Sequence, residues 1–269
     1  MIAPVPHNLA VQPTQTAETV VWVQGLCAGF GRRRVLQDVS FGVDRGELVA
    51  IVGPNGSGKS TLLKVLASLL RPWAGSVAIL GEPPGRRPLQ VAYLPQAEAV
   101  DWSFPVSVRD VVLMGRYRHA GWLRPTSQAD AAAANRALEQ VGMRALAHRQ
   151  VGELSGGQQR RAFLARALAQ NPELYLLDEP VTGVDPTTED ELMAILAAEC
   201  KQGKTVLAST HDLAGVAEHF SRLLSLNQTV VADGPAALVR DRSVLRATYG
   251  GHLLEVERGS VVLLDDPHH

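Results

Sequence analysis

A glycine-rich stretch at residues 53–60 constrains the fold of this chain more than any other feature. The stretch fits the pattern GxxxxGK[ST] and comprises Gly53, Pro54, Asn55, Gly56, Ser57, Gly58, Lys59 and Ser60. An apolar segment at 48–52 precedes it, and leucines at helical spacing follow it. A strand that leads through such a turn into a helix is the context in which this pattern binds phosphate. The alternative is a glycine-rich turn that matches by chance, which does not account for the flanking strand and helix.

The chemistry of this turn predicts a site for ATP. Glycines allow several backbone N–H groups to converge on phosphate oxygens, and the N-terminus of the following helix adds partial positive charge. Lys59 is expected to reach the β- and γ-phosphates, and the Ser60 hydroxyl is expected to bind Mg²⁺. Thr61, the next residue along the expected helix, joins the nucleotide-binding set.

Strand and helix patterns along the chain predict an α/β fold. Short apolar runs rich in β-branched residues indicate strands, at 20–23, 35–43, 48–52, 77–80, 91–94, 174–177, 205–209, 230–232 and 261–264. Apolar residues at helical spacing indicate helices, at 62–70, 129–141, 158–169 and 189–200. This alternation predicts a mostly parallel sheet, and the helix-rich middle of the chain is expected to be an insertion into it.

The expected organisation is one main domain with two tails. Residues 1–20 are rich in Pro, Thr and Gln and are expected to form a loose tail. The main domain is expected over 21–255, with the helical insertion at about 97–170, and residues 256–269 are expected to form a C-terminal tail. A chain of 269 residues is near the upper size for a single hydrophobic core.

Charge and composition narrow the choice of partners and compartment. The 26 basic and 27 acidic residues give a formal net charge of −1, so nucleic acid is not expected as a partner. No apolar run approaches the ~20 residues that span a bilayer. A signal peptide would begin with a basic segment, but no Lys or Arg precedes Arg32. Cys27 and Cys200 form no CxxC pair, so we expect two buried free thiols. These features predict a cytoplasmic protein that can dock on a membrane protein.

Two acidic residues end the apolar run at 174–177. Asp178 and Glu179 would lie at the carboxyl end of a buried strand, where doubly wound sheets bind their ligands. Asp178 is expected to hold Mg²⁺, directly or through water, and Glu179 is expected to act as general base on the attacking water. The alternative is a solvated acidic turn before Pro180.

A second glycine-containing helix start occurs at 154–158. Ser155 is a plausible N-cap, and Gly156, Gly157 and Gln158 follow it, which again indicates an anion site. The chain therefore has two phosphate-binding helix starts but one lysine-bearing loop. We expect the second start to serve an ATP held by another copy of the chain, in a two-fold dimer with two shared sites.

With these motifs in order, the sequence resembles the ABC ATPase family over residues 22–235. The resemblance implies a P-loop NTPase cassette with an antiparallel β part and a helical sub-domain. Further motifs match at 93–96, at 183–185 and at 210–212. By resemblance, Gln96 senses Mg²⁺ and the γ-phosphate, Asp185 contacts the opposite subunit, and His211 contacts the γ-phosphate.

The family usually stacks adenine on an aromatic residue ahead of the second strand. Phe30 occupies that place, and it supplies a stacking face without a hydroxyl. Packing of Phe30 in the core is the alternative.

The cargo prediction rests on a different segment and on resemblance. Residues 100–125 carry Trp102, Phe104, Tyr117 and Trp122, which suit a protein-docking surface for a permease. This segment resembles that of importers for manganese, zinc or iron(II), which work with a metal-binding solute-binding protein. Siderophore or haem import is the nearest alternative, and aromatics that simply pack the sub-domain are another. His268 and His269 are interpreted as an idle tail.

Three classes of function remain to be compared. The first is an energy-coupling ATPase at the cytoplasmic face of a membrane, driven by dimer closure on ATP. The second is a soluble ABC ATPase acting on ribosomes or DNA, against which stand the single cassette and the balanced charge. The third is a nucleotide-binding regulator without hydrolysis, against which stand Glu179 and His211.

Overall fold

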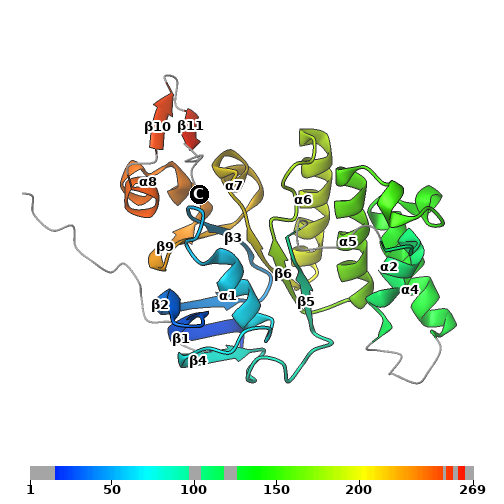
Figure 1. Cartoon of the computed structure of the whole chain (residues 1–269), viewed down its shortest axis with the longest axis horizontal. Helices are drawn as coiled ribbons and strands as arrows, with labels where there is room; N and C mark the ends of the chain where they lie inside the picture. The colour runs from blue at the N-terminus through cyan, green and yellow to red at the C-terminus, as the bar shows by residue number, and fades with distance from the viewer. Residues whose placement is uncertain (1–15, 97–103, 118–125, 251–252, 257–259, 264–269) are drawn as a thin grey trace, which may run out of the picture.

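The computed structural model describes residues 16–96, 104–117, 126–250, 253–256 and 260–263, and its centre is a six-stranded sheet (Figure 1). The strands of this sheet, in spatial order, are β5 (Val91–Leu94), β6 (Leu174–Asp178), β7 (Thr205–Ser209), β3 (Leu48–Val52), β8 (Arg222–Asn227) and β9 (Thr229–Pro235). Neighbouring strands are parallel from β5 to β8, and β9 is antiparallel to β8. The predicted α/β fold with a mostly parallel sheet is confirmed.

Helices on both faces explain why the central strands are buried along their whole length. Every residue of β3, β6 and β7 is buried, as expected for parallel strands covered on both sides. On one face α1 (Lys59–Leu66) packs in a cluster with Ile51, Leu174 and Leu176. On the other face α6 (Pro186–Lys201) packs in a cluster with Tyr175 and Leu177.

An antiparallel sheet lies beside the central one, in the order β2-β1-β4 (Figure 1). It consists of β1 (Thr19–Phe30), β2 (Arg33–Asp44) and β4 (Ala74–Ile79). Leu26, Leu36 and Phe41 of this sheet share a buried cluster with α1. The antiparallel β part expected from the family resemblance is therefore present, next to the helix that follows the glycine-rich turn.

Three helices pack together on the other side of the molecule, as Figure 1 shows: α2 (Val108–Met114), α4 (Gln128–Gln140) and α5 (Gly156–Gln170). Each begins with a capping box at Ser107, Ser127 or Ser155. The serine side chain accepts a hydrogen bond from the backbone N–H of the third helical residue, and the side chain of that residue accepts one from the serine backbone N–H. Short 3₁₀ turns η2 (Arg144–Leu146) and η3 (Val151–Glu153) join α4 to α5.

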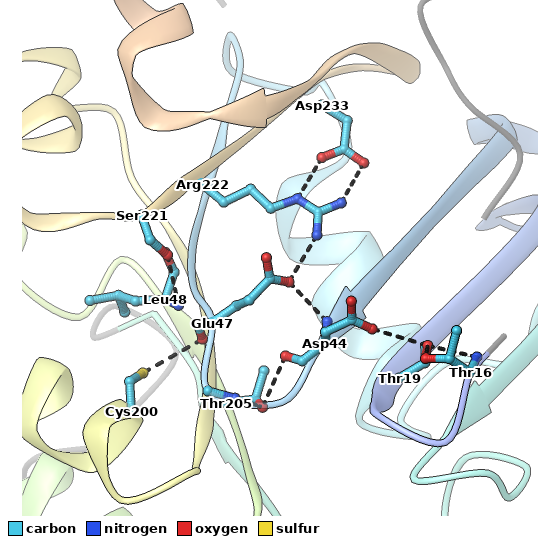
Figure 2. Close-up of polar contacts among 11 residues, drawn as sticks. Thr16, Thr19, Asp44, Glu47, Leu48, Cys200, Thr205, Ser221, Arg222 and Asp233 are labelled. Atoms are coloured by element: carbon cyan, nitrogen blue, oxygen red, sulfur yellow. Dashed lines mark hydrogen bonds and ion pairs between the residues drawn. The ribbon is translucent and has the colours of Figure 1, made fainter. Parts of the chain in front are cut away.

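A polar network ties the turn between β2 and β3 to strands β8 and β9 (Figure 2). Glu47 accepts hydrogen bonds from the Arg222 guanidinium and from the backbone N–H of Asp44, both at 2.8 Å. Arg222 also forms a bidentate pair with Asp233 at 2.8 and 2.9 Å. Thr19 extends the network into β1 by donating to Asp44 at 3.0 Å. These contacts fix the antiparallel sheet against the central one.

The described part of the C-terminal region adds a short helix and a hairpin. After α7 (Leu213–His219), β8 and β9 come the 3₁₀ helix η4 (Ala236–Arg240) and then α8 (Arg242–Tyr249). The hairpin of β10 (Leu253–Val256) and β11 (Ser260–Leu263) follows α8 and lies next to it in Figure 1. One of its strands falls within the expected tail at 256–269.

The N-terminal tail and the first helix both end earlier than the sequence predicts. The N-terminal tail was expected to reach residue 20, but β1 begins at Thr19, and Thr19 and Val20 are both buried. The first helix was expected to extend to residue 70, but α1 ends at Leu66. Ser68 has a left-handed φ of 61°, which ends the helix, and Leu69 is 64% exposed instead of packed.

Candidate functional site

The predicted motifs meet at one edge of the central sheet, where its parallel strands end. The glycine-rich loop follows β3, Asp178 ends β6, and Gln96 and His211 come two residues after β5 and β7. The strand register places Ser209 of β7 opposite both Ile51 and Asp178. Parallel pairing thus brings residues from distant parts of the chain to a common edge.

Three glycines give the loop at 53–60, here called the phosphate loop, its shape. Gly53, Gly56 and Gly58 have φ of 155°, 76° and 107°, which a glycine adopts at low cost. A Cβ at Gly53 would lie 2.0 Å from the carbonyl oxygen of Leu226, so only glycine fits there. Gly58 is also the N-cap of α1. Because Gly58 has no side chain, the first N–H groups of α1 remain available to a phosphate.

Lys59 is held inside the phosphate loop. Its side chain is buried, and its Nζ donates to the carbonyl oxygens of Gly53 at 2.7 Å and Pro54 at 3.2 Å. Desolvation lowers the pKa of Lys59, and the nearby carboxylates of Glu179 and Asp178 oppose this effect. A buried cation beside open helix N–H groups fits the charge of a nucleotide phosphate chain.

Asp178 is fixed by its neighbour strand. Its carboxylate is buried and accepts a hydrogen bond from Ser209 Oγ at 2.7 Å, while Ser209 Oγ itself accepts from the Glu179 backbone N–H at 3.0 Å. Ser60 lies in the first turn of α1, which follows β3, and β7 lies between β3 and β6. Hydroxyl, carboxylate and amide oxygens such as those of Ser60, Asp178 and Gln96 are the donor type that Mg²⁺ prefers, so these residues fit that ion.

Glu179 is the centre of a small polar cluster. Its Oε2 accepts from Gln96 Nε2 at 3.3 Å and from Thr182 Oγ1 at 3.1 Å, and His211 Nδ1 lies 3.6 Å from the same oxygen. The residue has a left-handed φ of 52°, which is uncommon for a non-glycine residue and is often found at functional sites. The predicted trio of Glu179, Gln96 and His211 is therefore brought together at one carboxylate.

The two titrating members of this cluster shift each other's pKa. Contact with the His211 imidazole lowers the pKa of Glu179, against the opposing effect of burial. Contact with the Glu179 carboxylate raises the pKa of His211, against desolvation. Both effects favour the charged pair, with a carboxylate at Glu179 and an imidazolium at His211.

The second glycine-containing helix start lies in a separate pocket of about 490 Å³. The described residues that line this pocket include Ser155, Gly156, Gly157, Gln158 and Asp185, but none of the phosphate loop. Asp185 caps α6, where its carboxylate accepts from the backbone N–H of Thr188 at 3.0 Å and from its hydroxyl at 2.7 Å. The two predicted phosphate-binding helix starts therefore lie at different places on one chain.

The remaining predicted residues have these positions. Phe30 ends β1 and is 50% exposed, so the alternative of core packing is wrong, and its role in adenine stacking stays a prediction. Asn55 is exposed, and Ser57 and Thr61 are buried in the phosphate loop and the start of α1. Cys27 and Cys200 are free thiols, each partly buried.

The predicted docking surface is described only in part. Phe104 and Tyr117 are large apolar side chains that are 61% and 51% exposed. Trp102 and Trp122 lie outside the described residues, as do His268 and His269. The docking surface therefore stays a prediction that the exposure of Phe104 and Tyr117 supports.

Sequence reasoning missed several residues that support the site. Ser209 joins Asp178 to Glu179, Thr182 bonds Glu179, and Arg160 donates to the Glu179 carbonyl oxygen at 3.0 Å. Thr182 had a local signal, because it lies three residues after Glu179 in the same turn. Ser209 and Arg160 had none, since their contacts depend on strand pairing and helix packing.

Comparison with known proteins finds a matching family and several similar chains. The ABC transporter family model matches residues 36–182. The chain is 45% identical over 233 residues to the zinc transport system ATP-binding protein TroB of Treponema pallidum, covering 87% of this chain and 88% of that protein. It is 46% identical over 264 residues to the chelated iron transport system membrane protein YfeB of Yersinia pestis, covering 97% and 87%. A third relative is the manganese transport system ATP-binding protein MntB of Bacillus subtilis, 44% identical over 233 residues, covering 87% and 93%.

Solved structures have the same fold. A metal-chelate type ABC transporter in an inward-facing conformation superposes with a TM-score of 0.77 and 28% identity, covering 91% of this chain and 95% of that one. A nucleotide-free ATP-binding cassette from an ABC transporter superposes with a TM-score of 0.75 and 25% identity, covering 86% and 99%.

Proposed function

Since this chain belongs to the ABC transporter family, whose ATP-binding subunits hydrolyse ATP, we propose that it powers a membrane importer for divalent metal ions. The cargo is manganese, zinc or iron. The observation that carries the cargo is the group of relatives named for zinc, chelated iron and manganese transport, each at least 44% identical over 87% or more of this chain. The observation that carries hydrolysis is the Glu179 carboxylate with Gln96 and His211 around it.

Different residues of one copy bind the phosphates, the adenine and Mg²⁺, and activate the attacking water. The N–H groups of the phosphate loop and Lys59 bind the phosphates, and Phe30 stacks on the adenine. Ser60, Asp178 and Gln96 hold Mg²⁺, which neutralises charge on the phosphates when bound. Glu179 accepts a proton from the attacking water. His211 Nδ1 lies 3.6 Å from the same carboxylate, and His211 contacts the γ-phosphate of bound ATP. His211 and Gln96 keep the base oriented.

The complete enzyme is a homodimer. The pocket with Ser155, Gly156, Gly157 and Gln158 is open and has no lysine-bearing loop in its described lining, so it binds the ATP held by the phosphate loop of the second copy. Asp185 lines the same pocket and contacts the opposite subunit. Closure on ATP and reopening after hydrolysis gives the two states that a transporter couples to its permease.

The dimer docks on a permease at the cytoplasmic face of the membrane. Across the stretches of chain described here, none of the helices has the length and apolar character needed to cross a bilayer. The exposed Phe104 and Tyr117 belong to the segment that receives the permease, together with Trp102 and Trp122. A metal-binding solute-binding protein delivers the cargo to the permease from outside.

A second candidate cargo is a metal chelate, such as a siderophore or haem. Two observations favour it, namely the relative named for chelated iron and the similarity to a metal-chelate type transporter.

Metal accumulation in cells tests the proposal. Cells that lack this chain are supplied with labelled manganese, zinc, iron or an iron chelate, and uptake is compared after complementation. We expect the parent chain to restore uptake of a free divalent ion, and Glu179→Gln to fail. The matched control is Glu139→Gln, which neutralises an exposed glutamate of α4 and should restore uptake fully. Unchanged uptake of all three ions in the deletion strain would refute the cargo, and uptake of the chelate alone would favour the second candidate.

A further inference from the structure

The phosphate loop rests on the strand β8 and the turn that follows it. The carbonyl oxygen of Leu226 approaches Gly53 so closely that a Cβ at Gly53 would be 2.0 Å from it. The backbone N–H of Gln228 donates to the carbonyl oxygen of Ser57 at 2.8 Å. Two points of the loop, its first glycine and its middle, are therefore positioned by a segment more than 160 residues further along the chain.

The last turn of α8 is hydrogen-bonded to β8. Thr248 Oγ1 donates to the Val244 carbonyl oxygen at 2.7 Å, and it also lies within hydrogen-bond distance of Ser225 Oγ. Because a hydroxyl has one proton, Ser225 is the donor to Thr248. Asn227 Nδ2 donates to the Thr248 carbonyl oxygen at 3.0 Å. Thr248 is 1% exposed and Ser225 0%, so the bond between their hydroxyl groups is shielded from water. These bonds fasten α8 to β8 directly beside Leu226.

Tyr249 approaches the phosphate loop itself. Its side chain is 3% exposed, and its hydroxyl oxygen faces the backbone N–H of Gly53. Within the described residues this hydroxyl has no hydrogen bond of ordinary geometry, and Ser57 Oγ of the phosphate loop also lacks a partner. A buried hydroxyl without a partner destabilises the fold. A functional role for the hydroxyl would explain why it is kept at this position.

We propose that Thr248 and Tyr249 are positioning residues for ATP, which hold β8 and Gly53 in the arrangement in which the phosphate loop binds the phosphates. Thr248 acts through Ser225 and Leu226, and Tyr249 acts on Gly53 by accepting a hydrogen bond from its backbone N–H when ATP is bound. Both residues lie beyond the segment at 36–182 that the family model matches. The inference depends on ATP binding by the phosphate loop and is independent of the transported ion.

Tyr249→Phe separates a positioning role from a structural one. The change removes one oxygen atom that lacks a partner, so the melting temperature of the nucleotide-free protein should stay the same or rise. If the hydroxyl positions Gly53, the dissociation constant for the non-hydrolysable analogue AMPPNP with Mg²⁺ should nevertheless increase, by about fivefold for one lost hydrogen bond. Isothermal titration calorimetry and differential scanning calorimetry on the full chain measure the two quantities.

A second pair of variants tests Thr248. Thr248→Val removes the hydroxyl and should also weaken AMPPNP binding about fivefold, whereas Thr248→Ser keeps the hydroxyl and should restore the parent affinity. The matched control is Arg246→Ala on the exposed face of α8, which should leave affinity unchanged.

The outcomes are distinguishable. Weaker binding by Tyr249→Phe without loss of thermal stability, together with rescue by Thr248→Ser, supports the inference. Affinities within twofold of the parent in both Tyr249→Phe and Thr248→Val would overturn it, whatever their stability. If the parent itself does not bind AMPPNP, the assignment of the phosphate loop fails first.

Discussion

The chain contains two glycine-containing helix starts that differ in almost every physical respect. The phosphate loop ahead of α1 has glycines with positive φ, is packed against β8, and encloses a buried lysine. At the start of α5, Gly156 and Gly157 do not have positive φ, and the helix is capped by Ser155 and Gln158. The packing around the phosphate loop shapes it for a nucleotide that the same copy of the chain binds. The second is an ordinary capped helix whose open side faces a pocket, so it can serve a ligand that arrives on another molecule.

The largest effect is expected for Glu179→Gln, which tests whether the start of α5 binds the second copy's ATP only while that ATP is uncleaved. Glu179→Gln removes the general base, so turnover should fall by about 10²- to 10⁴-fold while ATP binding persists. Because uncleaved ATP continues to join the two copies, the variant should elute as a dimer with ATP and as a monomer without it. Light scattering coupled to size-exclusion chromatography measures this, and hydrolysis at the parent rate would remove Glu179 from its role.

Substitution of the buried Lys59 should impair ATP binding by the phosphate loop and leave the start of α5 intact. Lys59→Ala loses a charge-assisted contact to the phosphates and should weaken ATP binding by about 100-fold. The α5 helix start is in a separate pocket, so its structure should be unaffected. Calorimetric titration with ATP measures the loss, with Lys64→Ala from the same helix as the control. Tight binding by Lys59→Ala would contradict the assignment of the phosphate loop.

A matched pair of glycine substitutions contrasts the two helix starts directly. Gly58 has a φ of 107° and its Cβ would lie 2.4 Å from Leu36 Cδ2, so Gly58→Ala should lower the free energy of unfolding by about 1–3 kcal/mol. No described atom lies within 4 Å of a Cβ at Gly156, and alanine suits a helix better than glycine. Gly156→Ala should therefore fold and bind ATP like the parent, and yet lose ATP-dependent dimerisation.

Chemical denaturation and the dimer assay together decide this contrast. Equal destabilisation by the two substitutions would mean that both helix starts are shaped by strained glycines. Normal dimerisation of Gly156→Ala would show that the pocket at α5 tolerates a side chain where a phosphate is expected.

The smallest expected effect concerns pH at the Glu179 and His211 pair. His211 has a raised pKa, so its contact with Glu179 contributes fully below the usual histidine pKa of about 6.5 and is lost as pH rises through the raised value. Glu179 has a lowered pKa, so its share is present above its usual pKa and is lost as pH falls through the lowered value. NMR titration should give a lower pKa for His211 in Glu179→Gln than in the parent. An unchanged value would mean that another group holds the proton on His211.

The phosphate loop was the part of the site most open to prediction from sequence, since its geometry is local. The glycines at 53, 56 and 58 carry their own conformational signal, and Asp178 and Glu179 end an apolar run that is typical of a buried strand. The parallel sheet followed from the alternation of strands and helices.

Contacts made through strand pairing and helix packing were not open to prediction. Ser209 bonds Asp178 because β6 and β7 pair in one particular register. β8 was missed altogether, although its Leu226 defines the space around Gly53, because its residues alternate too little to separate it from a helix. The end of α1 at Leu66 depends on the left-handed turn at Ser68, for which a serine gives no warning.

The contacts of Lys59 with its own loop have a consequence for product release. When ADP and phosphate leave, a buried ammonium group would ordinarily lose its partners, which is costly in a protein interior. Here Nζ donates to the Gly53 and Pro54 carbonyl oxygens, which belong to the protein itself. These two partners do not leave with the products, so product release leaves the Lys59 ammonium group hydrogen-bonded within its own loop.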